Sequence, residues 1–67
     1  MSDFSKEIVQ EELAAEEKNL QKINLYLKFF TNLYATEKGR ENENMMREYT
    51  RVKREKETLI KFLKSQL

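Results

Sequence analysis

The sequence contains almost nothing that would interrupt an α-helix. It has no proline, and Gly39 is the single glycine among 67 residues. Most other positions hold residues that favour helices, chiefly Glu, Lys, Leu, Gln, Arg, Met and Ala. Because glycine commonly follows the last turn of a helix, the segment KGREN at 38–42 predicts a helix end, a turn and a second helix capped by Asn42. The expected elements are a helix at about 4–38, a turn at 39–41 and a helix at about 42–66.

The start of the first predicted helix has several candidate capping residues. Ser5 can cap it, with Phe4 packing back on Val9 across the first turn. Ser2 or Asp3 could take the capping role instead, so this boundary stays open.

Apolar residues recur with a seven-residue spacing, which is typical of helices that pack side by side as a left-handed pair. In the first helix the stripe is Val9, Leu13, Glu16, Leu20, Ile23, Leu27, Phe30 and Tyr34. In the second helix it is Met45, Tyr49, Val52, Lys56, Leu59 and Leu63, supported by Met46, Ile60 and Leu67. We therefore expect an all-α fold, a single antiparallel helical hairpin formed by residues 1–67. One continuous helix in an extended coiled coil is the alternative, because a lone glycine costs only about 1 kcal/mol in a helix.

The first helix carries more apolar surface than one neighbouring helix can cover. Between residues 25 and 34 the apolar and aromatic side chains spread over an arc of roughly 200°. This surplus predicts contact with a second chain, either a copy that closes a four-helix bundle or a different protein. The expected interface residues are Phe4, Ile8, Val9, Leu25, Tyr26, Phe29 and Leu33.

The expected turn also sets which residues face each other. A turn centred near residue 40 places Lys56 opposite about residue 24 and leaves residues 3–12 without a facing helix, an overhang of about 15 Å. Glu16 and Lys56 interrupt the apolar stripes, but in this register an ion pair between them needs a second subunit or a different pairing. The simpler expectation is that Lys56 packs its aliphatic stem and extends its ammonium group to water.

The composition argues against an enzyme. The chain has no His and no Cys, so it lacks the base or thiol of the common nucleophilic sites. Gly-rich phosphate loops need several glycines, and this chain has one. The acidic pairs Glu7/Glu11 and Glu12/Glu16 are better explained as a solvated face than as a metal site. We expect no catalytic residue, no cofactor and no metal.

A row of arginines provides the alternative functional site. Arg47, Arg51 and Arg54 have the spacing of one helix face and could neutralise phosphates of a nucleic acid. Acidic residues interleave with them, and the net charge of +1 is low for a nucleic-acid-binding protein. Nucleic-acid binding by a dimer is therefore the second hypothesis.

The sequence also bears on location and partners. Its acidic start has no unbroken apolar run, unlike a secretory signal peptide, and no segment approaches the roughly 18–20 apolar residues of a membrane span. The absence of cysteine is compatible with a reducing cytoplasm. We expect a cytoplasmic interaction protein, a regulator, inhibitor or assembly factor that forms a homodimer and binds an unidentified protein.

Overall fold

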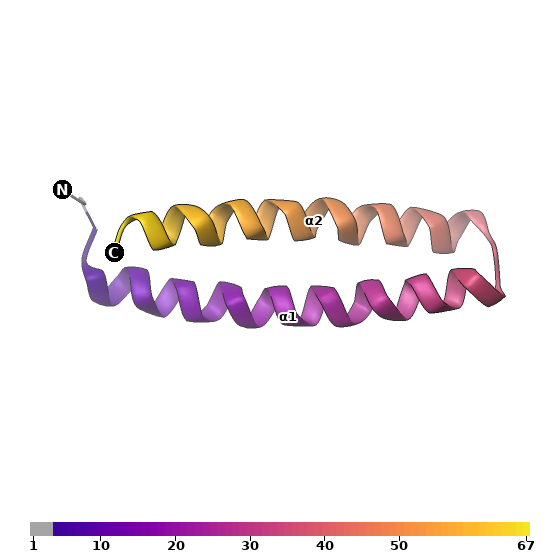
Figure 1. Cartoon of the computed structure of the whole chain (residues 1–67), viewed down its shortest axis with the longest axis horizontal. Helices are drawn as coiled ribbons and strands as arrows, with labels where there is room; N and C mark the ends of the chain where they lie inside the picture. The colour runs from indigo at the N-terminus through magenta and orange to yellow at the C-terminus, as the bar shows by residue number, and fades with distance from the viewer. Residues whose placement is uncertain (1–3) are drawn as a thin grey trace.

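The computed structural model describes residues 4–67, which form two antiparallel helices (Figure 1). Helix α1 spans Lys6–Thr36 and helix α2 spans Arg40–Ser65, with residues 37–39 as the turn between them. The helices pack side by side along a molecule 49 Å long, 15 Å wide and 12 Å thick. The all-α helical hairpin is confirmed, and the alternative of one continuous helix is wrong. We call the end where α1 begins and α2 finishes the open end.

The start of α1 follows the expected capping pattern. The Ser5 hydroxyl accepts a hydrogen bond from the Ile8 N–H at 3.5 Å, and the Ser5 carbonyl accepts one from the Val9 N–H at 3.0 Å. Ser5 is therefore the N-cap, as predicted. The alternative caps, Ser2 and Asp3, lie outside the described residues.

The turn differs from the prediction at both of its key residues. Gly39 lies in extended backbone (φ −144°, ψ 159°) and is the N-cap of α2, so it does not close α1. Asn42 is already inside α2, and its side-chain amide donates to the Glu37 carbonyl at 2.7 Å. That bond satisfies a carbonyl at the end of α1 that has no helical partner. The prediction of Asn42 as cap is wrong because α2 begins earlier, with acidic residues in its first turn that suit the helix dipole.

The core is a narrow seam between the helices. Within the described residues four apolar side chains are buried: Val9, Ile23, Ile60 and Leu63. On α1 the seam follows the predicted stripe. On α2 it is rotated from the main predicted stripe toward the supporting residues Met46 and Ile60, because Ile60 is buried while Leu59 is half-buried and Met46 is less exposed than Met45. The seam residues of α2 are Met46, Tyr49, Lys53, Lys56, Ile60 and Leu63.

The pairing of the helices also differs from the prediction. The Lys56 ammonium lies 2.6 Å from the Glu16 carboxylate within one hairpin. A turn centred at residue 38 brings Lys56 opposite about residue 20, and the two long side chains span the remaining helical turn. The overhang is shorter than predicted for the same reason, because Leu67 then lies opposite Val9 and not opposite Leu13. Val9 is only 3% exposed, and it lines a hollow together with Phe62 and Leu63 at the end of α2.

Candidate interaction surfaces

The two sides of the hairpin have different chemistry. On both helices, the residues that follow a seam residue in the sequence are mostly polar or charged. Many of the residues that precede a seam residue in the sequence are apolar. Because the helices are antiparallel, the preceding residues of both fall on the same side of the pair. We call this side the apolar face and the other the polar face. The apolar face comprises Phe4, Ile8, Tyr26, Phe29, Leu33, Met45, Val52, Leu59 and Phe62, with Leu25 at its edge.

Large side chains of the apolar face are open to solvent. Ile8 is 62% exposed, Phe29 54% and Phe62 50%, so both helices contribute to this surface. Single exposed apolar residues are common in soluble proteins, whereas a row of them on one side of a molecule is typical of interaction sites. The exposed apolar groups on α2 were not among the predicted interface residues.

Two hollows interrupt the apolar face. One, at the open end, measures about 210 Å³ and is lined by Phe4, Ile8, Val9, Glu12, Phe62, Leu63 and Gln66. The other, the aromatic hollow, measures about 390 Å³ and is lined by Leu25, Tyr26, Phe29, Phe30 and Tyr49. Both are bordered mainly by apolar side chains, which suits them to receive apolar groups of another helix.

The aromatic hollow is built by ring packing between the helices. The Tyr49 ring stacks against the rings of Tyr26 and Phe30, with centroids 5.8 and 5.6 Å away. Phe29 meets Phe30 edge to face at 5.1 Å. These contacts hold the aromatic side chains in place but leave the outer surface of Phe29 uncovered. A fixed and exposed aromatic group is typical of residues that anchor an interface.

The predicted interface residues do not all reach the surface. Phe4, Ile8, Leu25, Tyr26 and Phe29 are exposed and Leu33 is half-buried. Val9 is buried inside the hairpin, so it offers little surface to a partner. The sequence pattern alone did not separate Val9 from its exposed neighbour Ile8.

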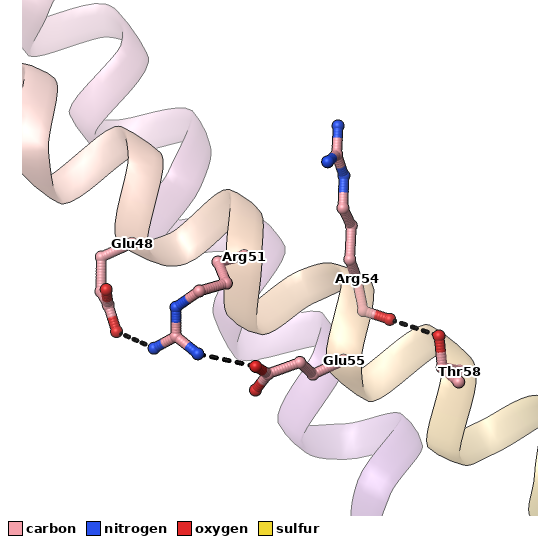
Figure 2. Close-up of polar contacts among 5 residues, drawn as sticks. All are labelled: Glu48, Arg51, Arg54, Glu55 and Thr58. Carbon is pink, nitrogen blue, oxygen red and sulfur yellow. Dashed lines mark hydrogen bonds and ion pairs between the residues drawn. The ribbon is translucent and has the colours of Figure 1, made fainter.

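The predicted arginine row lies along α2, and two of its members are already paired. Arg47 bonds to Glu43 at 2.6 Å. Figure 2 shows Arg51 held between Glu48 and Glu55, with the Glu55 contact at 2.6 Å. The hydrogen bond to Glu48, with the negative charges of both carboxylates, raises the pKa of Arg51 above its ordinary value.

Arg54 is arranged differently from the other two arginines. Its guanidinium extends away from the Glu48–Arg51–Glu55 chain, while its backbone carbonyl accepts a bond from Thr58 at 2.9 Å (Figure 2). The three arginines are thus interleaved with three carboxylates, and residues 43–55, which also include Lys53, carry a net charge of only +1. Such a row gives weak attraction to a phosphate backbone.

A hollow of about 570 Å³ lies beside this row on the polar face. It is lined by Tyr34, Glu43, Met46, Arg47, Thr50, Arg51, Arg54 and Glu55. Among the described residues, no buried side-chain nitrogen or oxygen lacks a hydrogen-bond partner. The lining therefore offers no buried, unpaired polar atom that would hold a small ligand.

Metal sites and membrane-spanning segments are the remaining kinds of site. No group of three acidic side chains in residues 4–67 lies close enough together to hold a metal ion. Glu16, from one of the predicted acidic pairs, is engaged by Lys56 instead. Neither helix contains a segment long and apolar enough to cross a membrane.

Comparison with known proteins adds no relative. The chain matches no protein-family model, no curated protein and no solved structure. Its function is therefore argued from its surfaces.

Proposed function

We propose that this hairpin is a protein–protein interaction module, a small regulator, inhibitor or assembly factor that acts as a homodimer through its helix faces. The apolar face supports the proposal most strongly. Its exposed side chains come from both helices and extend from the open end past the middle of the molecule. A cytoplasmic location, expected from the cysteine-free composition, is part of the same proposal.

The total exposed area supports a second chain as well. The hairpin exposes 5526 Å². A folded monomer of 8.1 kDa exposes about 4,500 Å² by the usual scaling with mass. The excess of roughly 1,000 Å² is close to the about 800 Å² that each partner buries in a standard protein interface. Contact with one further subunit would bury this excess area.

Nucleic-acid binding is the weaker proposal. It would rely on the arginine row, where Arg47 and Arg51 are already paired with carboxylates of their own helix. Exposed pairs of this kind are individually weak, but together they cancel the positive charge that a phosphate backbone would need.

A pair of substitutions with the same added charge tests the interaction proposal. Phe29→Glu places a carboxylate in the apolar face, whereas Gln21→Glu places one on the polar face of the same helix. We expect sedimentation velocity to show that Phe29→Glu loses the association of the wild type and that Gln21→Glu keeps it, because a buried carboxylate without a partner is costly.

Circular dichroism of the same samples provides the control for folding. Phe29 is more than half exposed in the isolated hairpin, so a charge there should not unfold it. Retained helix content in Phe29→Glu would show that a loss of association comes from the changed surface and not from unfolding. If Phe29→Glu keeps both the association state and the stability of the wild type, the apolar face is not the interaction surface.

A further inference from the structure

We propose that the chain covering the apolar face is a second copy packed with its turn at the same end, so that α1 of each copy lies on α2 of the other. This inference rests on the proposed homodimer and adds the arrangement of its subunits. The apolar face, the charge distribution and the positions of the two hollows support it.

Two copies can bring their apolar faces together by two-fold symmetry in two ways. If the axis runs along the helices, the turns lie at the same end and α1 faces the α2 of the other copy. If the axis runs across the helices, the turns lie at opposite ends and each helix faces its own counterpart. Figure 1 shows that one hairpin is long and narrow, so these arrangements differ greatly in the separation of the turns.

Charge distinguishes the two arrangements. In α1, residues 6–20 carry five carboxylates and two cations, a net charge of −3. In α2, residues 53–67 carry five cations and two carboxylates, a net charge of +3. Both segments lie in the open half of the hairpin. The cations of residues 53–67 lie in the seam or on the polar face, so they do not contact the other copy directly. The same-end arrangement still places each acidic segment over a basic segment of the other copy, which is an attraction between whole segments.

The opposite-end arrangement gains less from these charges. It places residues 6–20 of α1 on residues 21–36 of the other copy, where Lys22 and Lys28 are the only charged residues. It places the basic segment of α2 on residues 40–52, whose three cations and three carboxylates cancel. The complementary charges therefore favour turns at the same end.

The two hollows favour the same arrangement. With turns at the same end, the aromatic hollow faces the aromatic hollow of the other copy, and the hollow at the open end likewise faces itself. With turns at opposite ends, the aromatic hollow would face the region around residues 12–17 of the other α1, because residue 21 is the midpoint of that helix. On the side of the apolar face that region includes Glu12, so aromatic surface would be buried against a carboxylate.

A distance measurement between labelled turns tests the proposal. The chain has no cysteine, so Lys38→Cys provides one unique thiol in the turn for a nitroxide label. With turns at the same end, pulsed electron paramagnetic resonance of the dimer should give a short distance, at most about the combined thickness of two hairpins, each 12 Å thick. With turns at opposite ends, the distance should approach the full 49 Å length of one hairpin.

A second label site at the other end of the molecule shows whether the two copies lie side by side along their whole length. Lys64→Cys lies near the open end of α2, outside the apolar face, and should give the same short distance. Sedimentation velocity of the labelled samples establishes whether they are dimers. Dimers with a long distance at both sites would contradict the same-end arrangement but would still agree with the proposed homodimer. Monomers would overturn both this arrangement and the proposed homodimer.

Discussion

The ion pair between Glu16 and Lys56 is the polar contact that links the two helices at the seam. The carboxylate is 10% exposed and the lysine side chain 28%, with 2.6 Å between the charged atoms. A buried pair of this kind adds little net stability compared with apolar residues, but it penalises any pairing that separates its members. At a seam position, a polar residue can therefore fix the register of two helices.

Removing one member of this pair should cost more than removing both. In Lys56→Leu the Glu16 carboxylate stays buried without its cation, so we expect a loss of about 2 kcal/mol in the free energy of unfolding, less than for a fully buried pair because Lys56 is partly exposed. The double variant Glu16→Leu with Lys56→Leu should equal or exceed the wild type in stability. Urea denaturation at matched protein concentration measures both. A Lys56→Leu protein as stable as the wild type would show that the pair does not form.

At the scale of the helices, the sequence predicts the start of α1 better than it predicts the start of α2. The Ser5 cap was among the predicted ones, with Ser2 and Asp3 as alternatives, because a serine just before an amphipathic segment commonly caps the helix. The predicted role of Gly39 is wrong because a glycine between two helices can either follow the last turn of the first helix or precede the first turn of the second. In the structure Gly39 precedes α2, and Asn42 inside α2 donates to the Glu37 carbonyl. The sequence does not show which of the two roles the glycine takes.

The start of α2 lacks a side-chain cap, which leads to a prediction for Gly39. Its extended backbone suits any residue, and an added Cβ would meet nothing within 4 Å. Gly39→Ser should therefore raise the free energy of unfolding by about 0.5–1 kcal/mol, through a capping hydroxyl and a less flexible unfolded chain. Gly39→Ala lacks the hydroxyl and should gain less. Urea midpoints at equal concentration compare the three proteins, and a loss of stability in both variants would contradict the structure of this turn.

At the scale of the whole molecule, the spacing of apolar residues and the single glycine were enough to predict a two-helix hairpin. They were not enough to predict its register. If the centre of the turn is placed one residue too late, the residue expected to face any given position changes by two. For this reason the contact between Lys56 and Glu16 within one hairpin was not predicted. The sequence predicted the apolar arc on α1. It did not predict that Phe62 and Met45 of α2 lie on the same side of the hairpin, because that depends on the rotation of α2 and on its antiparallel packing against α1.

The central claim is that a second copy of the chain covers the apolar face. Sedimentation equilibrium of the wild type across a dilution series tests it most directly. The account predicts a mass of twice 8.1 kDa down to low concentration, with dissociation on dilution following a single monomer–dimer equilibrium. A helical species of 8.1 kDa at every concentration would contradict the account, because the apolar face would then remain open to solvent in the isolated protein.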